Sequence, residues 1–343
     1  MIASLLKERK LPALPATREE MIDILAREEY GPMPPKPLSV EAVQRNTGIK
    51  YEHCSGHAVY TEYDLTAHME GFDFTFPIRC IFPKKYPEKG APCFILINFR
   101  PEVPDWYFPA QEIADNGFAA ICIYYNDITK DEEDGFSSGV APDIIKHCGP
   151  TGKISMWAWA CSRALDYALT RDDIDPDRIA VIGHSRLGKT ALWAGANDER
   201  FPIVISNDSG CSGAAVSRGK VGETIGRISS VFPRWFNDKY KEYSDREYEA
   251  PFDQHFLLAA IAPRKICVGN ASEDTWADPV SEYLCCCAVS HVWEKAGKPG
   301  FVHPDRLPEI GEAFQQGSIS YHLTDGVHYL GRADWLRYMD FMR

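Results

Sequence analysis

A serine stands where an apolar run of the sequence gives way to a pattern typical of a buried helix. The run Arg178–Gly183 ends in Gly183-His184-Ser185, and a helix is expected to start directly afterwards. This is the setting of a nucleophile elbow, a sharp strand-to-helix turn that raises a serine hydroxyl above a sheet. The usual pattern is G-x-S-x-G, whereas here Leu187 holds the second small position and the glycine comes one residue later. We therefore predict that Ser185 is a catalytic nucleophile; the alternative is an ordinary serine that caps the helix.

Two cations follow this serine on what should be one face of the helix. Arg186 and Lys189 are three residues apart, and the rest of the helix has the composition of a buried element. Burying two charges is costly unless they face a wet pocket, and exposed cations at a helix N-terminus oppose its dipole. We expect Arg186 to stabilise an oxyanion, with its backbone N–H as one donor, and Lys189 to hydrogen-bond substrate hydroxyls or a ring oxygen.

A base and an acid for the serine are expected after later strands, because this type of triad runs in the order Ser, acid, His. His328 lies in the loop after the last apolar run, 318–323, and is the predicted base, whereas His322 falls inside that run and should be structural. Asp208 and Asp274 each follow an earlier apolar run. Either carboxylate can hold the imidazole in the correct tautomer, so the residues alone leave both open; the alternative for each is a turn or helix-cap aspartate.

The elements that would position these groups form a regular series after residue 92. Short apolar runs alternate with helical stretches, which indicates a parallel sheet covered on both faces, with ligands at the carboxyl ends of its strands. The expected strands are Cys93–Phe99, Phe118–Tyr125, Arg178–Gly183, Pro202–Ser206, Lys265–Gly269 and Ser318–Leu323, and the expected helices span 108–116, 154–170, 187–197, 279–297 and 331–342.

The N-terminal region, 1–90, has a different pattern. Thr17-Arg-Glu-Glu20 is a capping box that predicts a helix over 18–29, and residues 72–82 alternate with period two. We predict one α/β-hydrolase domain over 1–343, with a mostly parallel central sheet flanked by helices on both faces and an antiparallel N-terminal edge. A long insertion at 210–255 should form a lid-like or binding region near the active site.

Composition excludes several classes of partner. The 343 residues carry a formal net charge of −12, which argues against nucleic acid or an anionic membrane as the main partner. No stretch approaches the roughly 20 apolar residues of a membrane helix, and Met1–Lys10 does not read as a secretion signal, so we expect a soluble cytoplasmic protein. The eleven cysteines should be mostly buried thiols, and Cys285-Cys286-Cys287 a helix face that cannot close around one metal ion.

Several motifs together resemble one family, the glucuronoyl esterases of carbohydrate esterase family fifteen, and in particular its bacterial branch. The likeness covers roughly residues 90–343. The motifs are Gly183-His-Ser-Arg-Leu-Gly-Lys189, Asn207-Asp-Ser-Gly-Cys-Ser-Gly-Ala-Ala215, Gly222-Glu-Thr224, Asp253-Gln-His255, Ile261-Ala-Pro-Arg264 and Glu273-Asp-Thr-Trp-Ala-Asp-Pro279. The resemblance implies an α/β-hydrolase without metal or organic cofactor, which cleaves the ester between 4-O-methyl-glucuronate on xylan and a lignin alcohol.

The resemblance also implies roles for individual residues. It implies that Ser185 is the nucleophile, His328 the base and Arg186 the oxyanion stabiliser. It also implies that the uronate hydroxyls and ring are contacted by Lys189, Glu223 and Trp276.

The resemblance assigns the acid of the triad less directly than the nucleophile and the base. The usual acid of the family is a Glu in the segment matched by Asn207-Asp208, and other members use one that matches Asp274; we prefer Asp208. Gln254 and His255 would either line the pocket or form structural hydrogen bonds.

We therefore predict a serine carboxylic-ester hydrolase that acts on 4-O-methyl-glucuronoyl esters through an acyl-enzyme. Without a secretion signal, its substrates should be small or oligosaccharide uronate esters. Arg186 and Lys189 suit an ester whose product is a carboxylate. The alternatives are an acetyl or other small-ester hydrolase on the same scaffold, and a carbohydrate-binding relative that has lost catalysis.

Overall fold

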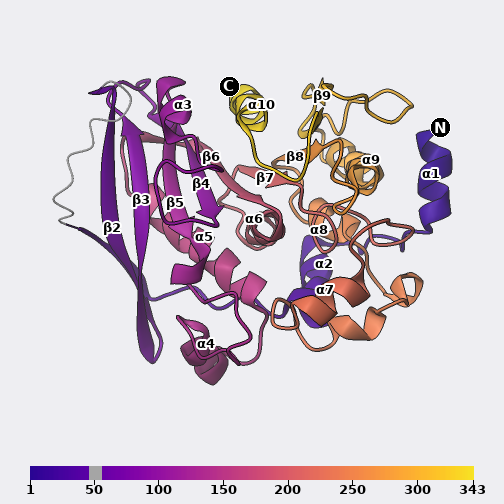
Figure 1. Cartoon of the computed structure of the whole chain (residues 1–343), viewed down its shortest axis with the longest axis horizontal. Coiled ribbons are helices and arrows are strands. Elements are labelled where there is room, and N and C mark those ends of the chain that lie inside the picture. Colours follow the sequence, from indigo (N-terminus) through magenta and orange to yellow (C-terminus); the bar gives the residue numbers. More distant parts are fainter. Residues whose placement is uncertain (46–55) are drawn as a thin grey trace.

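The computed structural model describes residues 1–45 and 56–343, and within them ten strands form one mixed sheet (Figure 1). Across the sheet the strands follow the order β1-β2-β3-β5-β4-β6-β7-β8-β10-β9. Their bounds are β1 Ser39–Gln44, β2 Ala58–Met69, β3 Phe72–Pro83, β4 Ala91–Asn98, β5 Ala119–Tyr124, β6 Ile174–His184, β7 Ile203–Asn207, β8 Lys265–Ala271, β9 Ala313–Phe314 and β10 Ile319–Thr324.

The middle of the sheet is parallel, as the continuous apolar runs predict. The parallel part consists of β5, β4, β6, β7, β8 and β10. Every residue of β4 and of β7 is buried, because helices cover both faces of these strands.

Antiparallel pairing is found at both edges of the sheet. The strands β1, β2 and β3 pair antiparallel, and β3 pairs antiparallel with β5, which confirms the predicted N-terminal edge. At the other edge, β9 pairs antiparallel with β10. That strand was not predicted, since two residues are too short to show a period.

Helices lie on both faces of the sheet. In Figure 1, α3 and α10 lie above the central strands, and α5, α6 and α8 lie below them. The helices are α1 Ile2–Arg9, α2 Arg18–Leu25, α3 Ala110–Asp115, α4 Ala141–Cys148, α5 Lys153–Ala168, α6 Arg186–Asn197, α7 Ile225–Val231, α8 His255–Ala259, α9 Pro279–Lys295 and α10 Arg332–Met342.

Each face of the sheet has its own core. On β4, Ile95 and Ile97 pack into the core that contains α5, α6, α8 and α9, whereas Phe94 and Leu96 pack against α3 and α10. This alternation follows from the period of two in a strand. The sheet is thereby fixed between two layers of helices, and the carboxyl ends of its strands are held in place.

The predicted N-terminal helix is present with a modified last turn. Thr17 caps α2 through the predicted capping box, in which its side chain accepts from the backbone of Glu20. The helix continues as a π-helical turn, Ala26–Tyr30. Tyr30 is buried there and stacks on Trp193 of α6, so the turn is attached to the central layer.

The segment 210–255 is folded into short helices around a group of aromatic side chains. It contains α7 and two 3₁₀ turns, Tyr240–Tyr243 and Glu247–Glu249. Trp235, Phe236 and Tyr240 are buried in it. On α9, Cys285 and Cys286 are buried and Cys287 partly so, as predicted for a core-facing helix.

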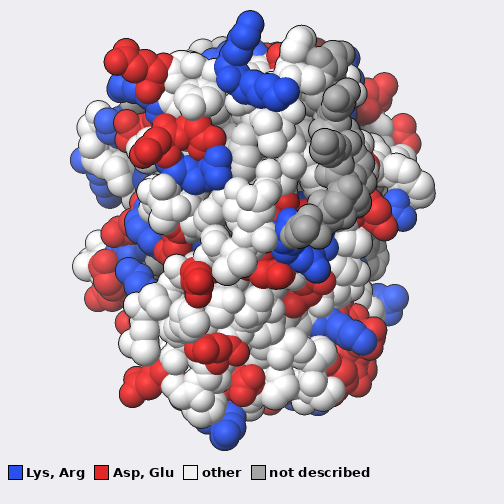
Figure 2. Space-filling view, turned by 90° about the vertical axis from the view of Figure 1, so that its left-hand side faces the viewer, with Lys and Arg blue, Asp and Glu red and all other residues white. Residues whose placement is uncertain are grey.

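The surface at the N-terminal edge carries charges of both signs. Figure 2 shows acidic and basic side chains interspersed over the described part of this face. Arg45, directly after β1, forms ion pairs with Glu62 and Asp64 of β2. Charged side chains on an edge strand discourage pairing with another sheet. Of the helices in the described ranges, none combines the length and the apolar character that crossing a membrane requires.

Candidate active site

The turn between β6 and α6 has the geometry of a nucleophile elbow. Ser185 lies between the two elements with φ 58° and ψ −126°, a conformation that non-glycine residues rarely adopt. A Cβ at position 183 would lie 2.0 Å from the carbonyl oxygen of Leu187, so only glycine fits there. Leu187 itself is fully buried, which explains how the second small position of the pattern accepts a large side chain.

Two cavities meet at this serine. The polar cavity, of about 240 Å³, contains several charged side chains and lies towards α6 and the segment 210–255; the aromatic cavity, of about 400 Å³, is lined mainly by rings. Ser185, Arg186 and His328 line both. The polar cavity is further lined by Lys189, Asp208, Ser209, Gly210, Glu223, Phe232, Trp235, Trp276 and Ala277, and the aromatic one by Phe99, Arg100, Trp106, Tyr107 and His184.

His328 reaches these cavities from the loop after β10 and is held by Asp274. Its Nδ1 lies 2.5 Å from Oδ2 of Asp274, whose Oδ1 accepts a hydrogen bond from the backbone N–H of Ala277 at 3.1 Å. Burial raises the pKa of Asp274, but the hydrogen bond and the charge of His328 outweigh it, so this pKa is below its usual value. An ionised carboxylate at Nδ1 leaves Nε2 of the imidazole available as a base.

The hydrogen bond that we expected from Asp208 is therefore made by Asp274. Asp208 is nearby, since one ligand atom from each of Asp208, Asp274 and His328 lies within 4.8 Å of the other two. However, its Oδ1 accepts from the backbone N–H of Ala271 at 2.8 Å, and its Oδ2 has no hydrogen-bond partner among the described residues and lies 4.0 Å from Nδ1 of His184. The side chain of Asp208 thus faces Ala271 at the end of β8, and the contact with His328 that we expected of Asp208 is made by Asp274 instead.

A second carboxyl group shares the environment of Asp208. Burial raises the pKa of Asp208 well above its usual value, and the charge of Glu282 on α9 raises it further. Burial likewise raises the pKa of Glu282 to about 7, while the backbone N–H of Gly210 donates to it at 2.5 Å. These shifts favour the neutral form of Asp208 and the ionised form of Asp274, and an ionised carboxylate is the better partner for an imidazolium ion.

The nucleophile and the base are neighbours in the cavity without being hydrogen-bonded. In residues 1–45 and 56–343, no hydrogen bond joins the Ser185 hydroxyl to His328. Such bonds are often long or poorly aligned until substrate is present. Next to them, His184 is buried and bonded to Asn207 at 2.6 Å, and burial lowers its pKa to about 3. His184 is therefore neutral and supports the ring of His328, whose centre lies 4.5 Å away.

Arg186 is fixed by residues that sequence reasoning missed. Its guanidinium donates to Oδ2 of Asp131, and Oδ1 of Asp131 accepts from the indole N–H of Trp235 at 2.6 Å. The same guanidinium lies 4.6 Å from the centre of the Trp235 ring and 5.0 Å from that of Phe232. Asp131 begins an ordinary acidic run, 131–134, so no signal in the sequence marks it.

A buried lysine fastens the loop that carries Asp131. The Nζ of Lys153, at the start of α5, donates to the carbonyl oxygens of Lys130 and Glu132 at 2.5 and 2.7 Å, and to Asp134 at 2.9 Å. Asp131 lies between the two anchored carbonyl groups. Its position relative to Arg186 is therefore set by α5, on the other side of the loop.

The predicted sugar contacts gather in the polar cavity. The side chain of Lys189 is buried and donates to the carbonyl oxygen of Ser209 at 2.6 Å and to Glu223 at 3.3 Å. The backbone N–H of Glu223 donates to the carbonyl oxygen of Trp276 at 3.0 Å, so the two loops are joined. Trp276 is 49% exposed and lines the cavity.

Gln254 is not part of the site. It is fully buried and lines neither cavity; its amide donates to both carboxylate oxygens of Glu29, and its oxygen accepts from Tyr30. His255 bonds to the carbonyl oxygen of Pro12, which is the structural alternative that we left open. His322 is structural as predicted, since its Nε2 is bonded to Asp334.

The sheet order and the serine elbow, with a histidine in the loop after the last parallel strand, define an α/β-hydrolase. A family model described as "Glucuronyl esterase, fungi" matches residues 66–297. The chain therefore belongs to the glucuronyl esterase family, and the resemblance drawn from the sequence motifs is confirmed.

The relative with the higher identity supports the bacterial branch. Carbohydrate esterase MZ0003, from an unknown prokaryotic organism, is 42% identical over 232 residues, which are 66% of this chain and 53% of that protein. This chain thus matches only about half the length of that relative. A 4-O-methyl-glucuronoyl methylesterase of Phanerochaete carnosa is 27% identical over 310 residues, covering 86% of this chain and 71% of the relative.

Solved structures agree along nearly the whole chain. The glucuronoyl esterase from Solibacter usitatus superimposes with a TM-score of 0.84 at 32% identity, covering 96% of this chain and 92% of the other. A promiscuous CE15 esterase from a marine bacterial metagenome gives a TM-score of 0.83 at 30% identity, covering 95% and 90%.

Proposed function

We propose that this protein is a serine carboxylic-ester hydrolase that acts on esters of uronic acids. The observation that carries the proposal is the polar cavity, in which Ser185 and the Asp274-bound His328 lie beside Lys189 and Glu223. A nucleophile with a base accounts for ester cleavage, and the buried ion pair accounts for a polar, oxygen-rich acyl group. Family membership and the names of the relatives point to the same chemistry.

The chemical steps follow from the positions of the side chains. Ser185 Oγ attacks the ester carbonyl carbon while Nε2 of His328 takes its proton, and Asp274 stabilises the imidazolium ion. The negative charge on the carbonyl oxygen is met by the N-terminus of α6, with the backbone N–H of Arg186 as donor and its guanidinium close by. The alcohol leaves with the proton of His328, and water then hydrolyses the acyl-enzyme to release the uronate.

The polar cavity suits one sugar ring. Its volume is about 240 Å³, and Lys189 and Glu223 offer a donor and an acceptor for ring hydroxyls. The half-exposed Trp276 offers a flat apolar face to a pyranose. The cations favour the developing oxyanion and the carboxylate product over a neutral lipid-like acyl group.

The leaving alcohol would occupy the aromatic cavity on the other side of Ser185. Phe99, Trp106 and Tyr107 line it, and the guanidinium of Arg100 lies 4.3 Å from the centre of the Trp106 ring. Such walls favour an aromatic or otherwise apolar alcohol. Benzyl D-glucuronate therefore matches both cavities and is the substrate of choice for a first assay.

Two measurements test the proposal. A fluorophosphonate probe should label the wild-type enzyme covalently and leave Ser185→Ala unlabelled, since the probe needs an activated serine. The enzyme should then hydrolyse benzyl D-glucuronate with a higher kcat/KM than an acetylated sugar. Absence of labelling would favour a binding protein, and a higher efficiency on the acetyl ester would overturn the substrate assignment but keep the esterase.

A further inference from the structure

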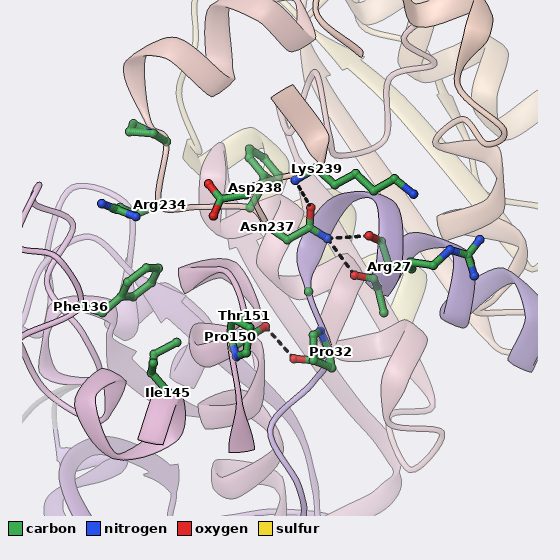
Figure 3. A pocket seen from close by; sticks show the side chains of 14 residues that line it. Arg27, Pro32, Phe136, Ile145, Pro150, Thr151, Arg234, Asn237, Asp238 and Lys239 are labelled. Carbon is green, nitrogen blue, oxygen red and sulfur yellow. Dashed lines mark hydrogen bonds between the residues drawn. The ribbon is translucent and has the colours of Figure 1, made fainter. Parts of the chain in front are cut away.

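A third cavity, of about 320 Å³, lies outside the catalytic site (Figure 3). It is enclosed by the π-helical turn after α2, the loop between α4 and α5, and the segment 233–239. It shares no lining residue with the two cavities at Ser185. Its walls are formed by Ala26, Arg27, Gly31, Pro32, Phe136, Ile145, Pro150, Thr151, Pro233, Arg234, Phe236, Asn237, Asp238 and Lys239.

Cations outnumber anions around this cavity, although the whole chain has a formal net charge of −12. Three of the lining residues, Arg27, Arg234 and Lys239, are basic, whereas Asp238 is the only acidic one. Glu28 forms ion pairs with both Arg27, at 2.8 Å, and Lys239, at 2.6 Å, so one carboxylate serves two cations. Asp238 is itself paired with a neighbouring lysine at 3.1 Å. The local balance is therefore positive.

Arg234 is the cation whose charge is not compensated. Throughout the described residues its side chain has no carboxylate within ion-pair distance, and its Nε is buried without an acceptor. Its guanidinium lies 5.4 Å from the centre of the Phe136 ring, and Figure 3 shows Arg234, Phe136 and Ile145 along one side of the cavity. A ligand in the cavity would reach the terminal N–H groups of this guanidinium rather than the buried Nε, and acceptor oxygens there would supply the partner that the charge lacks.

Phe136 is held in an unusual conformation next to this arginine. Its φ is 63°, a value that is uncommon for a bulky residue and that is found mainly where surrounding groups enforce it. The carboxylate of Asp134 accepts the backbone N–H of Phe136 at 3.1 Å, and Lys153 holds Asp134 at 2.9 Å. The aromatic wall of the cavity is thus built and fixed, in keeping with a binding site.

The other polar groups of the lining already have partners. Asn237 donates to the carbonyl oxygens of Ala26 and Arg27, both at 3.0 Å, and Thr151 donates to that of Pro32 at 2.6 Å (Figure 3). These bonds join the three walls to one another. The guanidinium of Arg234, beside an apolar surface, is therefore the group of the lining that remains available to bind a ligand.

We propose that this cavity binds a small molecule with an oxyanion group and an apolar face, and that Arg234 anchors the oxyanion. The planar fork of a guanidinium matches carboxylate and phosphate oxygens in a bidentate geometry. A uronic acid and an organic phosphate both offer such a group. The proposal is independent of the proposed function, because neither Ser185 nor any residue assigned to the sugar contacts lines this cavity.

Isothermal titration of the whole protein with sodium D-glucuronate and, separately, with inorganic phosphate tests this site. The probe that matches the site should bind saturably to the wild type, and Arg234→Gln should weaken this binding about tenfold or more, the loss expected for one charged hydrogen-bond donor. Arg227→Gln, at an exposed arginine of α7 outside the cavity, is the matched control and should bind like the wild type. Arg234→Lys keeps the charge without the fork and should be intermediate.

For the glucuronate titration, Lys189→Gln serves as background, so that binding in the catalytic cavity is removed and only the event that depends on Arg234 is measured. Loss of binding in Arg234→Gln with one probe only identifies which oxyanion the site takes. The proposal is overturned when neither probe binds the wild type, or when Arg234→Gln and Arg234→Lys both bind as tightly as Arg227→Gln. Should Arg234→Gln fail to fold, by its thermal melting curve, the lysine variant decides in the same way.

Discussion

Replacing Asp274 by asparagine is the sharpest perturbation of the catalytic site. In the wild type, Oδ1 of Asp274 accepts from the backbone N–H of Ala277 and Oδ2 faces Nδ1 of His328. The amide introduced by Asp274→Asn would keep its oxygen on the Ala277 N–H, because only the oxygen can accept. Its NH₂ group would then face Nδ1, which must become an acceptor. The imidazole proton moves to Nε2, the nitrogen that has to accept the proton of Ser185.

The size of the effect follows from this reversal. A base in the wrong tautomer lowers kcat by about 10⁴-fold in triads of this kind. That factor corresponds to about 5.4 kcal/mol of lost transition-state stabilisation. The proposed ground-state contacts of the sugar with Lys189, Glu223 and Trp276 would be untouched, so KM should change far less than kcat.

Asp208→Asn is the matched control, because the two carboxylates are buried neighbours of one histidine. Burial raises the pKa of Asp208, which favours its neutral form, and asparagine resembles that form in charge and shape. Its Oδ1 can still accept from the N–H of Ala271. We expect Asp208→Asn to keep kcat within a fewfold of the wild type.

The assay is steady-state hydrolysis of benzyl D-glucuronate by the wild type and both variants, with thermal melting curves to establish that each variant is folded. The assignment of the acid fails if Asp208→Asn loses more activity than Asp274→Asn. Equal losses in both variants would instead mean that the two carboxylates act as one unit, and would also contradict a role for Asp274 alone.

Two further predictions concern the loop and the core. Asp131→Asn should lower kcat about tenfold with little change in KM, because the guanidinium of Arg186 loses a charged partner; an unchanged kcat on benzyl D-glucuronate would exclude a positioning role. Burial raises the pKa of Glu29 to about 8, so its contribution to stability is complete below the unfolded pKa of about 4.3 and is lost as the pH rises towards 8. Glu29→Gln should therefore flatten the pH dependence of the unfolding free energy in this window by up to about 1.4 kcal/mol per pH unit; equal slopes for variant and wild type in melts across the window would contradict a neutral Glu29.

Local patterns along the chain predicted the class of fold correctly and indicated a candidate nucleophile and a candidate base. The continuous apolar run before Ser185 predicts a strand buried on both faces, and the change to a helical pattern predicts the sharp turn that follows. Thr17 and Glu20 predict the start of α2, because a capping box needs only four consecutive residues. These signals depend on neighbours in the sequence, so they can be read without coordinates.

The acid could not be chosen in this way. Asp208 follows β7 and Asp274 follows β8, and these strands are adjacent and parallel, so both carboxylates arrive at the same edge of the sheet. The course of the turn after each strand determines which carboxylate contacts His328, and the difference is only a few ångströms. Asp208 turns back to the backbone of Ala271, and Asp274 points into the cavity.

Other members of the site depend on contacts between distant segments. Asp131 accepts a hydrogen bond from Arg186, which is 55 positions away in the sequence. Gln254 donates to Glu29 in the core, and these two residues are 225 positions apart. The sequence by itself determined which residue types were present and on which kind of element each would lie. Only the packing of the layers decided which of them met, because side-chain contacts between segments far apart in the chain depend on the exact course of loops that no local pattern encodes.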